Sequence, residues 1–365
     1  MAKAALRVEE REITVDHPCE FFPTECREGE QRDWTREDDF FRQKEITSLW
    51  NFFIAQGRHR AAEKVWIEVL RVSGDWEKQN HGPRVFKGTP YYLWGVTRIL
   101  GGDLEKGFLL LHLAYQEDKE RHPNEEPVRS AAHVFITLTH DATTPPPFVE
   151  RIEQVEKFLR DRIEEYQKTR GGTLTLDEFR SRFLACTDLQ DVVFLFVFSA
   201  FRLLKWSTKM DKTLTRNAFA SLLQADTLFA FCLVLDKVAE TKNSANKGKH
   251  PSFAGNLAFL SNRTSLNLHR TVRRKKDVPE VSLASHAFGI AFDETLQSLL
   301  DSQYRFCHDP NIRAQPIEED MMIALGLRNF GAHRIEDQPI IYQNFKEIAQ
   351  RILNALFFAV ENLYP

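Results

Sequence analysis

The chain has 365 residues, of which 42% are hydrophobic and 28% charged, a composition typical of a soluble globular protein with about two domains. Its formal net charge of −3 excludes nucleic-acid binding by the surface as a whole and leaves only local basic patches for that role. No apolar run reaches the roughly 18–20 residues that span a bilayer, and the N-terminal residues lack a signal-peptide core, so we expect a cytoplasmic protein without membrane contact.

Residues 1–40 are polar, acidic and interrupted by prolines, which predicts an irregular or partly extended arm. His17, Cys19 and Cys26 in this arm could supply three zinc ligands, but no fourth ligand follows at a usual spacing. The five cysteines are scattered, and an odd count argues against a disulfide framework. We therefore expect neither a metal nor another cofactor.

Apolar residues recur at helical spacing from Phe41 to the end, and strand-like alternation is almost absent, so the predicted class is all-α. Residues 41–170 form a predicted domain of helical hairpins. The first hairpin turns at Gly57, with Trp50 before the turn and Trp66 after it on apolar faces. A second hairpin turns at 101–102, and a third pair is predicted at 130–140 and 148–166.

The first two hairpins share a pattern of small and large residues. When their turns are superposed, Gly107 falls on Ala62, and a large residue follows one helical turn later in both hairpins. Together with Gly95, this resembles tetratricopeptide repeats, which would imply a concave surface for a protein partner or regulator. The offset between the turns is longer than the roughly 34 residues of that family, and a plain helical bundle remains the alternative.

A second predicted domain covers residues 171–365, after a joint at Arg170-Gly171-Gly172. Thr175 and Glu178 predict a capping box at its first helix. Its main helices are predicted near 189–205, 215–241, 280–304, 317–331 and 341–363.

A basic insertion at about 241–279 interrupts this second domain, and its length makes it either disordered or functional. It contains five basic residues whose spacing suits phosphate contact, and we treat them as candidate RNA-binding residues: Arg270, Arg273, Arg274, Lys275 and Lys276. A solvated loop is the alternative interpretation.

The stretch LRNFGAHR, residues 327–334, is the candidate catalytic site. An Arg followed by a His at similar spacing also occurs at 11–17 and 263–269, so the spacing alone decides nothing. The context is more specific: Asn329 follows Arg328, Gly331 loosens the end of the preceding helix, and a long amphipathic helix follows His333.

These residues resemble the signature of the HEPN superfamily of α-helical ribonucleases, which consists of Arg, a polar residue that is often Asn, a few further residues, and His. The signature lies between the last two helices of a small bundle, and the resemblance covers about Asp188 to Pro365. It implies a HEPN-like bundle, a homodimer through that bundle and a composite cleft. It also implies a metal-independent endoribonuclease that acts as a toxin or antiviral defence effector.

The residue types suit that chemistry on physical grounds as well. RNA supplies its own nucleophile, the 2′-hydroxyl, so the enzyme has only to move protons and stabilise negative charge. We assign proton transfer to His333, whose ordinary pKa lies near neutrality, and phosphate stabilisation to Arg328. Asn329 is expected to fix Arg328 or the backbone. The alternatives are a non-catalytic helical adaptor that binds a protein partner through its repeats, and a protein that binds RNA through the basic insertion without cleaving it.

Overall fold

The computed structural model confirms the all-α class. It describes residues 4–8, 11–15, 44–80, 85–121, 123, 130–140, 144, 146–209, 218–243, 251–272, 278–307, 309–333 and 339–365. Within these ranges the chain is mostly helical, and its strands form two short antiparallel pairs. The chain divides into two compact units, Met1–Gln154 and Val155–Pro365.

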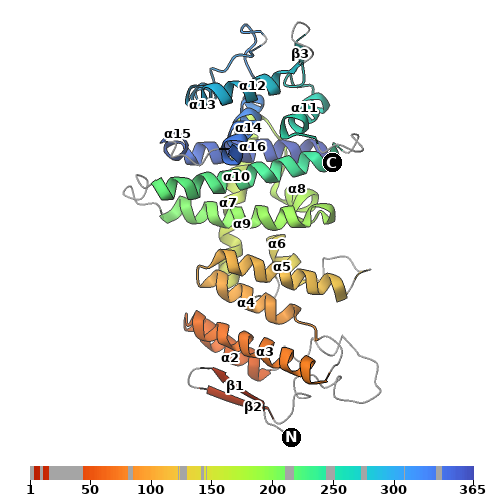
Figure 1. The fold of residues 1–365 in the computed structure, drawn as a ribbon, viewed down its shortest axis with the longest axis vertical. Helices are drawn as coiled ribbons and strands as arrows, with labels where there is room; N and C mark the ends of the chain where they lie inside the picture. Colours follow the sequence, from red (N-terminus) through yellow and green to blue (C-terminus); the bar gives the residue numbers. More distant parts are fainter. Residues whose placement is uncertain are drawn as a thin grey trace. The chain divides into compact units, whose positions relative to one another are not determined.

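The N-terminal unit begins with a β-hairpin in the predicted arm and continues with helices (Figure 1). Its elements are β1 (Ala4–Val8), β2 (Arg11–Val15), α2 (Lys44–Ala55), α3 (His59–Asn80), α4 (Gly88–Leu100), α5 (Leu104–Arg121), α6 (Ala131–Ile136) and the first part of α7 (Pro146–Arg170). The pairs α2–α3 and α4–α5 confirm the first two predicted hairpins, whereas α6 is shorter than the predicted first helix of the third pair.

Glycines form the turns and the close crossing of this unit. Gly57 and Gly102 adopt φ angles of 67° and 89°, a region that glycine reaches without steric cost. Gly95 and Gly107 face each other where α4 crosses α5, because a Cβ built on either one would lie within 3.0 Å of the other's carbonyl oxygen. The small residues thus permit the close approach that the sequence predicted.

The C-terminal unit contains the rest of α7 and the helices that follow it (Figure 1). These elements are α8 (Leu176–Phe179), η3 (Arg180–Leu184), η4 (Thr187–Leu189), α9 (Gln190–Lys209), α10 (Ala218–Lys242), α11 (Phe253–Arg263), β3 (Thr271–Val272), β4 (Val278–Pro279), α12 (Glu280–Ile290), α13 (Phe292–Leu300), α14 (Pro316–His333), α15 (Pro339–Gln343) and α16 (Phe345–Leu363). Helices α10, α14 and α16 pack against one another.

Aromatic side chains fill the core of this unit. Phe179 contacts Phe196 and Phe357 edge to face, with ring centroids 5.4 and 5.3 Å apart, and Phe196 also contacts Phe231. All four rings are fully buried. Phe196 therefore places α9 in the core of the C-terminal unit.

The division between the units lies inside α7, earlier than the joint predicted at residues 170–172. Helix α7 continues through the division without a break, and its last turns belong to the C-terminal unit. Tyr166 contacts Phe357 of α16, and Arg170 pairs with Asp320 of α14. The amphipathic pattern of α7 is continuous, so the sequence does not indicate where along this helix the packing neighbours change. The predicted capping box of Thr175 and Glu178 is confirmed.

Two long helices of the prediction are each broken in the structure. The helix expected at 280–304 breaks at Ala291, where φ is −142° and ψ is 78°. The helix expected at 341–363 is interrupted at Asn344, whose side chain donates to the Ile340 carbonyl at 2.9 Å beside its own backbone N–H at 3.2 Å.

The basic insertion contains regular structure. Helix α11 begins at an N-cap, Ser252, whose hydroxyl accepts from the Gly255 N–H, and it buries Phe253, Leu257 and Leu260. Strands β3 and β4 pair at the far end of the insertion. The glycine- and asparagine-rich sequence before α11 concealed this helix from pattern analysis.

Within the described ranges, no single helix is both long and apolar enough to cross a membrane. One bent pair of helices, Leu176–Leu184 with Thr187–Lys205, is long and apolar enough when its members are taken together, and the bend between them is 73°.

Candidate active site at the end of helix α14

Helix α14 carries the candidate catalytic residues and is anchored at its opposite end by buried acids. Glu318, Glu319 and Asp320 in its first turns are at most 1% exposed. Acids near a helix N-terminus are favourable on electrostatic grounds alone, but here they also have specific partners. Glu318 accepts from the Gln315 N–H at 2.8 Å and also from the Asn267 N–H.

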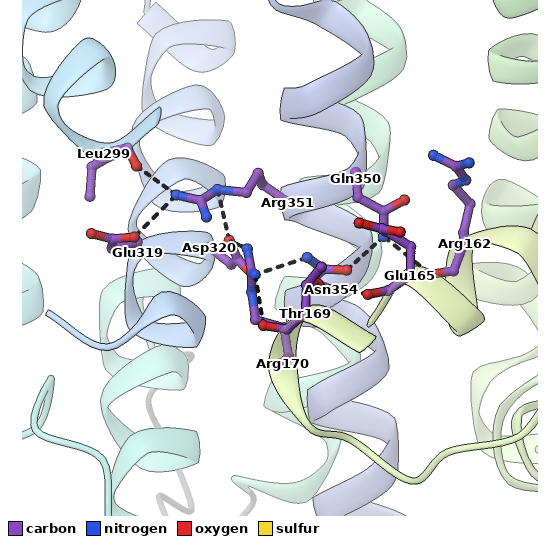
Figure 2. A network of polar contacts seen from close by, with 10 residues as sticks. All are labelled: Arg162, Glu165, Thr169, Arg170, Leu299, Glu319, Asp320, Gln350, Arg351 and Asn354. Carbon is purple, nitrogen blue, oxygen red and sulfur yellow. Dashed lines mark hydrogen bonds and ion pairs between the residues drawn. The ribbon is translucent and has the colours of Figure 1, made fainter. Parts of the chain in front are cut away.

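Asp320 lies at the centre of a buried ion cluster (Figure 2). Arg170 donates to its two carboxylate oxygens at 2.6 and 3.0 Å, and the Arg351 Nε lies 2.9 Å from it. Asn354 donates to the same carboxylate, while Arg351 also reaches Glu319 at 3.2 Å. Burial raises the pKa of the Asp320 carboxyl, and the two arginines oppose that rise. The cluster ties α14 to α7 and α16.

Arg328 lies about two helical turns beyond this cluster and faces α10. Its Nη2 is 3.8 Å from an Asp236 carboxylate oxygen, and its side chain is 33% exposed. That separation gives a charge pair without a close hydrogen bond. The buried Nε of Arg328 has no hydrogen-bond partner among the described atoms. Arg328 is therefore held near a counter-charge while donors remain for a ligand.

Asp236 is in turn positioned by two buried amides. Asn256 of α11 donates to its other carboxylate oxygen at 2.7 Å, and Asn243 donates to the Asn256 side-chain oxygen at 3.0 Å. Burial raises the pKa of Asp236, whereas the Asn256 hydrogen bond and the charge of Arg328 lower it. The insertion helix α11 thus supports the residue that faces Arg328.

Asn329 faces a different neighbour. Its amide donates to the hydroxyl of Ser285 on α12 at 2.8 Å. The bond connects α14 with α12. That Asn329 also fixes Arg328 or the backbone stays a prediction.

His333 is the last residue of α14, and its side chain lies outside the described part of the chain. We expected the helix to loosen at Gly331, but it continues through His333. On a helix of 3.6 residues per turn, Arg328 and His333 lie about 140° apart around the axis, whereas Asn329 and His333 share a face. One copy of α14 does not bring the positions of Arg328 and His333 to a common face.

The candidate RNA-binding residues are only partly described. Arg270 is exposed immediately before β3, and its carbonyl accepts from the Glu280 N–H at 3.1 Å. Arg273, Arg274, Lys275 and Lys276 lie outside the described residues. Strands β3 and β4 pair antiparallel, with Thr271 opposite Pro279 and Val272 opposite Val278.

Other chemistry near Arg328 is limited by burial. Cys232 of α10 is fully buried, and burial raises the pKa of its thiol, so the reactive thiolate is disfavoured. No group of three or more His, Cys, Asp or Glu residues suited to a metal occurs in the described ranges. The possible zinc ligands His17, Cys19 and Cys26 fall in a part that the structure does not describe.

Sequence reasoning missed the residues that position this site. Asp236 lies in an apolar helix 92 positions before Arg328, and Asn256 lies in the insertion. The one available signal was a lone acidic residue within the apolar run FCLVLDKVA, which a purely structural helix has little reason to bury.

Comparison with protein-family models, with curated proteins and with solved structures gives no match for this chain. The interpretation of the site therefore depends on its own residues and geometry.

Proposed function

We propose that the protein is a metal-independent endoribonuclease of HEPN-like architecture whose site combines Arg328 and His333 from two copies of the chain. The observation that carries the proposal is the state of Arg328. It is a guanidinium one-third exposed to solvent and held near Asp236, with 3.8 Å between Nη2 and the nearer carboxylate oxygen. Such a group is prepared to receive a phosphate.

The proposed reaction has one displacement at phosphorus. His333 removes the proton from the RNA 2′-hydroxyl, the O2′–P bond forms, and the P–O5′ bond breaks. The leaving 5′-oxygen takes a proton from a protonated His333 imidazole, so this residue type serves as base in the attack and as acid towards the leaving group. Arg328 neutralises the charge that grows on the non-bridging oxygens.

A second copy of the chain resolves the geometry of α14. Because Arg328 and His333 do not share a face of one helix, a two-fold axis near the end of α14 would bring Arg328 of one protomer towards His333 of the other. A homodimer through the C-terminal unit follows from this arrangement. A toxin or defence role belongs to the same proposal and is supported only by the family resemblance.

The direct test is RNA cleavage by the purified full-length protein with EDTA present. We expect wild-type cleavage of single-stranded RNA, and a loss of about two or more orders of magnitude in Arg328→Ala and His333→Ala. Arg160→Ala is the matched control, because Arg160 is an exposed arginine whose ion pair, among the described residues, is with Glu156 on its own helix. Circular dichroism should give equal helicity for all variants. Full activity in both site variants would refute the assignment.

A second candidate function, a non-catalytic helical adaptor, is favoured by a specific observation. The polar ends of Arg328 and Asn329 both have partners inside their own chain, namely Asp236 and Ser285. On this account the residues hold the bundle together, and the N-terminal hairpins bind a protein. Stoichiometric capture of one partner by a wild-type protein that cleaves no RNA would favour it.

A further inference from the structure

Helix α11 of the insertion carries a buried amide on its apolar face. Asn256 is fully buried, and it shares that face with Phe253, Leu257 and Leu260, which are also buried. The four residues follow the i, i+3, i+4, i+7 spacing of a helix face that packs against its neighbours. Packing therefore fixes the place of the Asn256 side chain, and a side chain fixed in this way can orient another group.

Both ends of the Asn256 amide bind residues at the C-terminal half of α10. The amide nitrogen donates to one carboxylate oxygen of Asp236 at 2.7 Å. The amide oxygen accepts from the side-chain nitrogen of Asn243 at 3.0 Å, and Asn243 is itself buried. A reversed amide would place two donors together at Asn243 and two oxygens together at Asp236. The bond from Asn243 therefore ensures that the donor end of Asn256 faces the carboxylate.

The carboxylate of Asp236 lies between two donors that it holds unequally. One oxygen is 2.7 Å from the Asn256 nitrogen, whereas the other is 3.8 Å from Nη2 of Arg328. Burial raises the pKa of Asp236, and among the influences that lower it the hydrogen bond from Asn256 is larger than the charge of Arg328. The amide of the insertion, rather than the guanidinium, is thus the main partner of this carboxylate.

The loss of that amide would change the partner of Asp236. The Asp236 side chain is only 19% exposed, and a largely buried carboxylate without a hydrogen bond is costly. Its nearby cation is Arg328, and arginine and carboxylate prefer a close pair with two parallel hydrogen bonds. Such a pair would occupy the donors that the proposed reaction offers to phosphate. Asn256 prevents it by holding the carboxylate at its present distance.

We propose that Asn256 is a positioning residue of the candidate active site, through which the insertion keeps Arg328 available to the phosphate of RNA. With the amide in place, Asp236 orients Arg328 from 3.8 Å. Without it, Asp236 closes on Arg328 and inhibits the site. The contact between α11 and α10 therefore controls the site. This proposal rests on the ribonuclease function proposed above and adds the regulation of that same site.

The test is a double-mutant cycle in the full-length protein, read as KM and kcat for cleavage of a single-stranded RNA. Asn256→Ala should raise KM by about fivefold or more and change kcat less, because RNA has to displace Asp236 from Arg328 before the reaction. In the Asp236→Asn background, the same substitution should change KM by less than about twofold. Asn262→Ala is the matched control, because Asn262 is exposed on the same helix, and it should leave KM unchanged.

A merely structural role for Asn256 gives a different pattern. If the amide only holds α11 on α10, Asn256→Ala should have the same effect in both backgrounds, and that result would overturn the proposal. An unchanged KM in the wild-type background would do so as well. Asn243→Ala serves if Asn256→Ala does not fold, since it retains Asn256 but removes the bond that orients its amide. It should also raise KM, by a smaller factor, and an unchanged KM would again overturn the proposal.

NMR of the arginine side chains separates this proposal from the ribonuclease function. The signal of Arg328 is assigned by its loss in Arg328→Gln. In free Asn256→Ala protein, rotation about the Cζ–Nε bond of Arg328 should be slower than in the wild type, because a close carboxylate pair holds the guanidinium. Slower rotation in a protein that cleaves no RNA would support the role of Asn256 and refute the ribonuclease function. RNA cleavage with unchanged rotation and unchanged KM would support the ribonuclease function and refute the role of Asn256.

Discussion

At the residue scale, the site depends on one weak charge pair. Asp236 is close enough to orient Arg328 but too far to occupy it with a short hydrogen bond, since 3.8 Å separates their nearest atoms. A partly exposed pair at this separation contributes little to stability, so its value would lie in positioning. Asn256 and Asn243 support the carboxylate from behind.

Replacing Arg328 by Gln should raise the pKa of Asp236 further, because the arginine charge is one of the influences that hold it down. Carboxyl carbon NMR titration would measure the change. Arg202→Gln is the control. Arg202 of α9 pairs with Asp226, which lies on α10 as Asp236 does, so this substitution should leave the pKa of Asp236 unaffected. Identical Asp236 titration in wild type and Arg328→Gln would show that the two charges do not interact.

The raised pKa of Asp236 in the wild-type protein determines how the free energy of unfolding depends on pH. Folded Asp236 holds its proton to a higher pH than the unfolded chain, whose Asp pKa is about 3.9. Its contribution to stability is therefore greatest below the unfolded pKa and falls as pH rises through the folded pKa. Asp236→Asn should remove this part of the pH dependence in urea denaturation.

At the scale of elements, the turns and the helix crossing were predictable from the sequence, because glycine is favoured where φ is positive and where two helix backbones approach closely. Gly57, Gly95, Gly102 and Gly107 all lie where the pattern placed them. The helix breaks at Ala291 and Asn344 were not predictable, because neither residue is a strong helix breaker. The break at Asn344 coincides with a side-chain hydrogen bond that only the folded chain shows.

Gly107→Ala should destabilise the N-terminal unit by about 1–3 kcal/mol, as overpacking does in closely packed interiors. The new Cβ would lie 2.5 Å from Ile99 Cγ1 and 3.0 Å from the Gly95 carbonyl oxygen. Gly74→Ala is the matched control, because a Cβ there meets nothing within 4 Å. It should stabilise α3 by about 0.5–1 kcal/mol. Denaturant unfolding would measure both, and equal effects would contradict the close crossing.

Arg351→Met should cost about 3–5 kcal/mol of stability, because it leaves Glu319 and Asp320 buried with fewer compensating charges. Arg160→Met removes an exposed i,i+4 pair with Glu156 and should cost less than about 1 kcal/mol. Urea denaturation of the two variants gives the comparison. Similar losses would mean that the buried cluster does not anchor α14.

At the scale of the whole molecule, the all-α class followed from helical periodicity, but the division into units did not. The boundary between the two units lies inside α7. The last turns of α7 belong to the C-terminal unit through contacts between residues far apart in sequence, such as Arg170 with Asp320. The candidate site shows the same limit. Arg328, Asn329 and His333 were visible as a motif, whereas Asp236, Asn256 and Ser285 became visible only through the fold.

A composite site predicts complementation between inactive chains. Arg328→Ala and His333→Ala should each be inactive alone. After the two are mixed and their subunits exchange at random, activity should return to roughly a quarter of the wild-type value, because each heterodimer retains one intact site. RNA cleavage before and after exchange, with light scattering for the dimer, would measure this. No recovery despite exchange would place Arg328 and His333 in one chain.

The chemical nature of the cleaved ends tests the central claim most directly. A defined single-stranded RNA should be incubated with wild-type protein and EDTA, and the product ends identified by mass spectrometry. Attack by the 2′-hydroxyl predicts a 2′,3′-cyclic phosphate on one fragment and a 5′-hydroxyl on the other, both absent with Arg328→Ala. Products with a 3′-hydroxyl and a 5′-phosphate, or RNA left intact by the wild-type protein, would contradict the account.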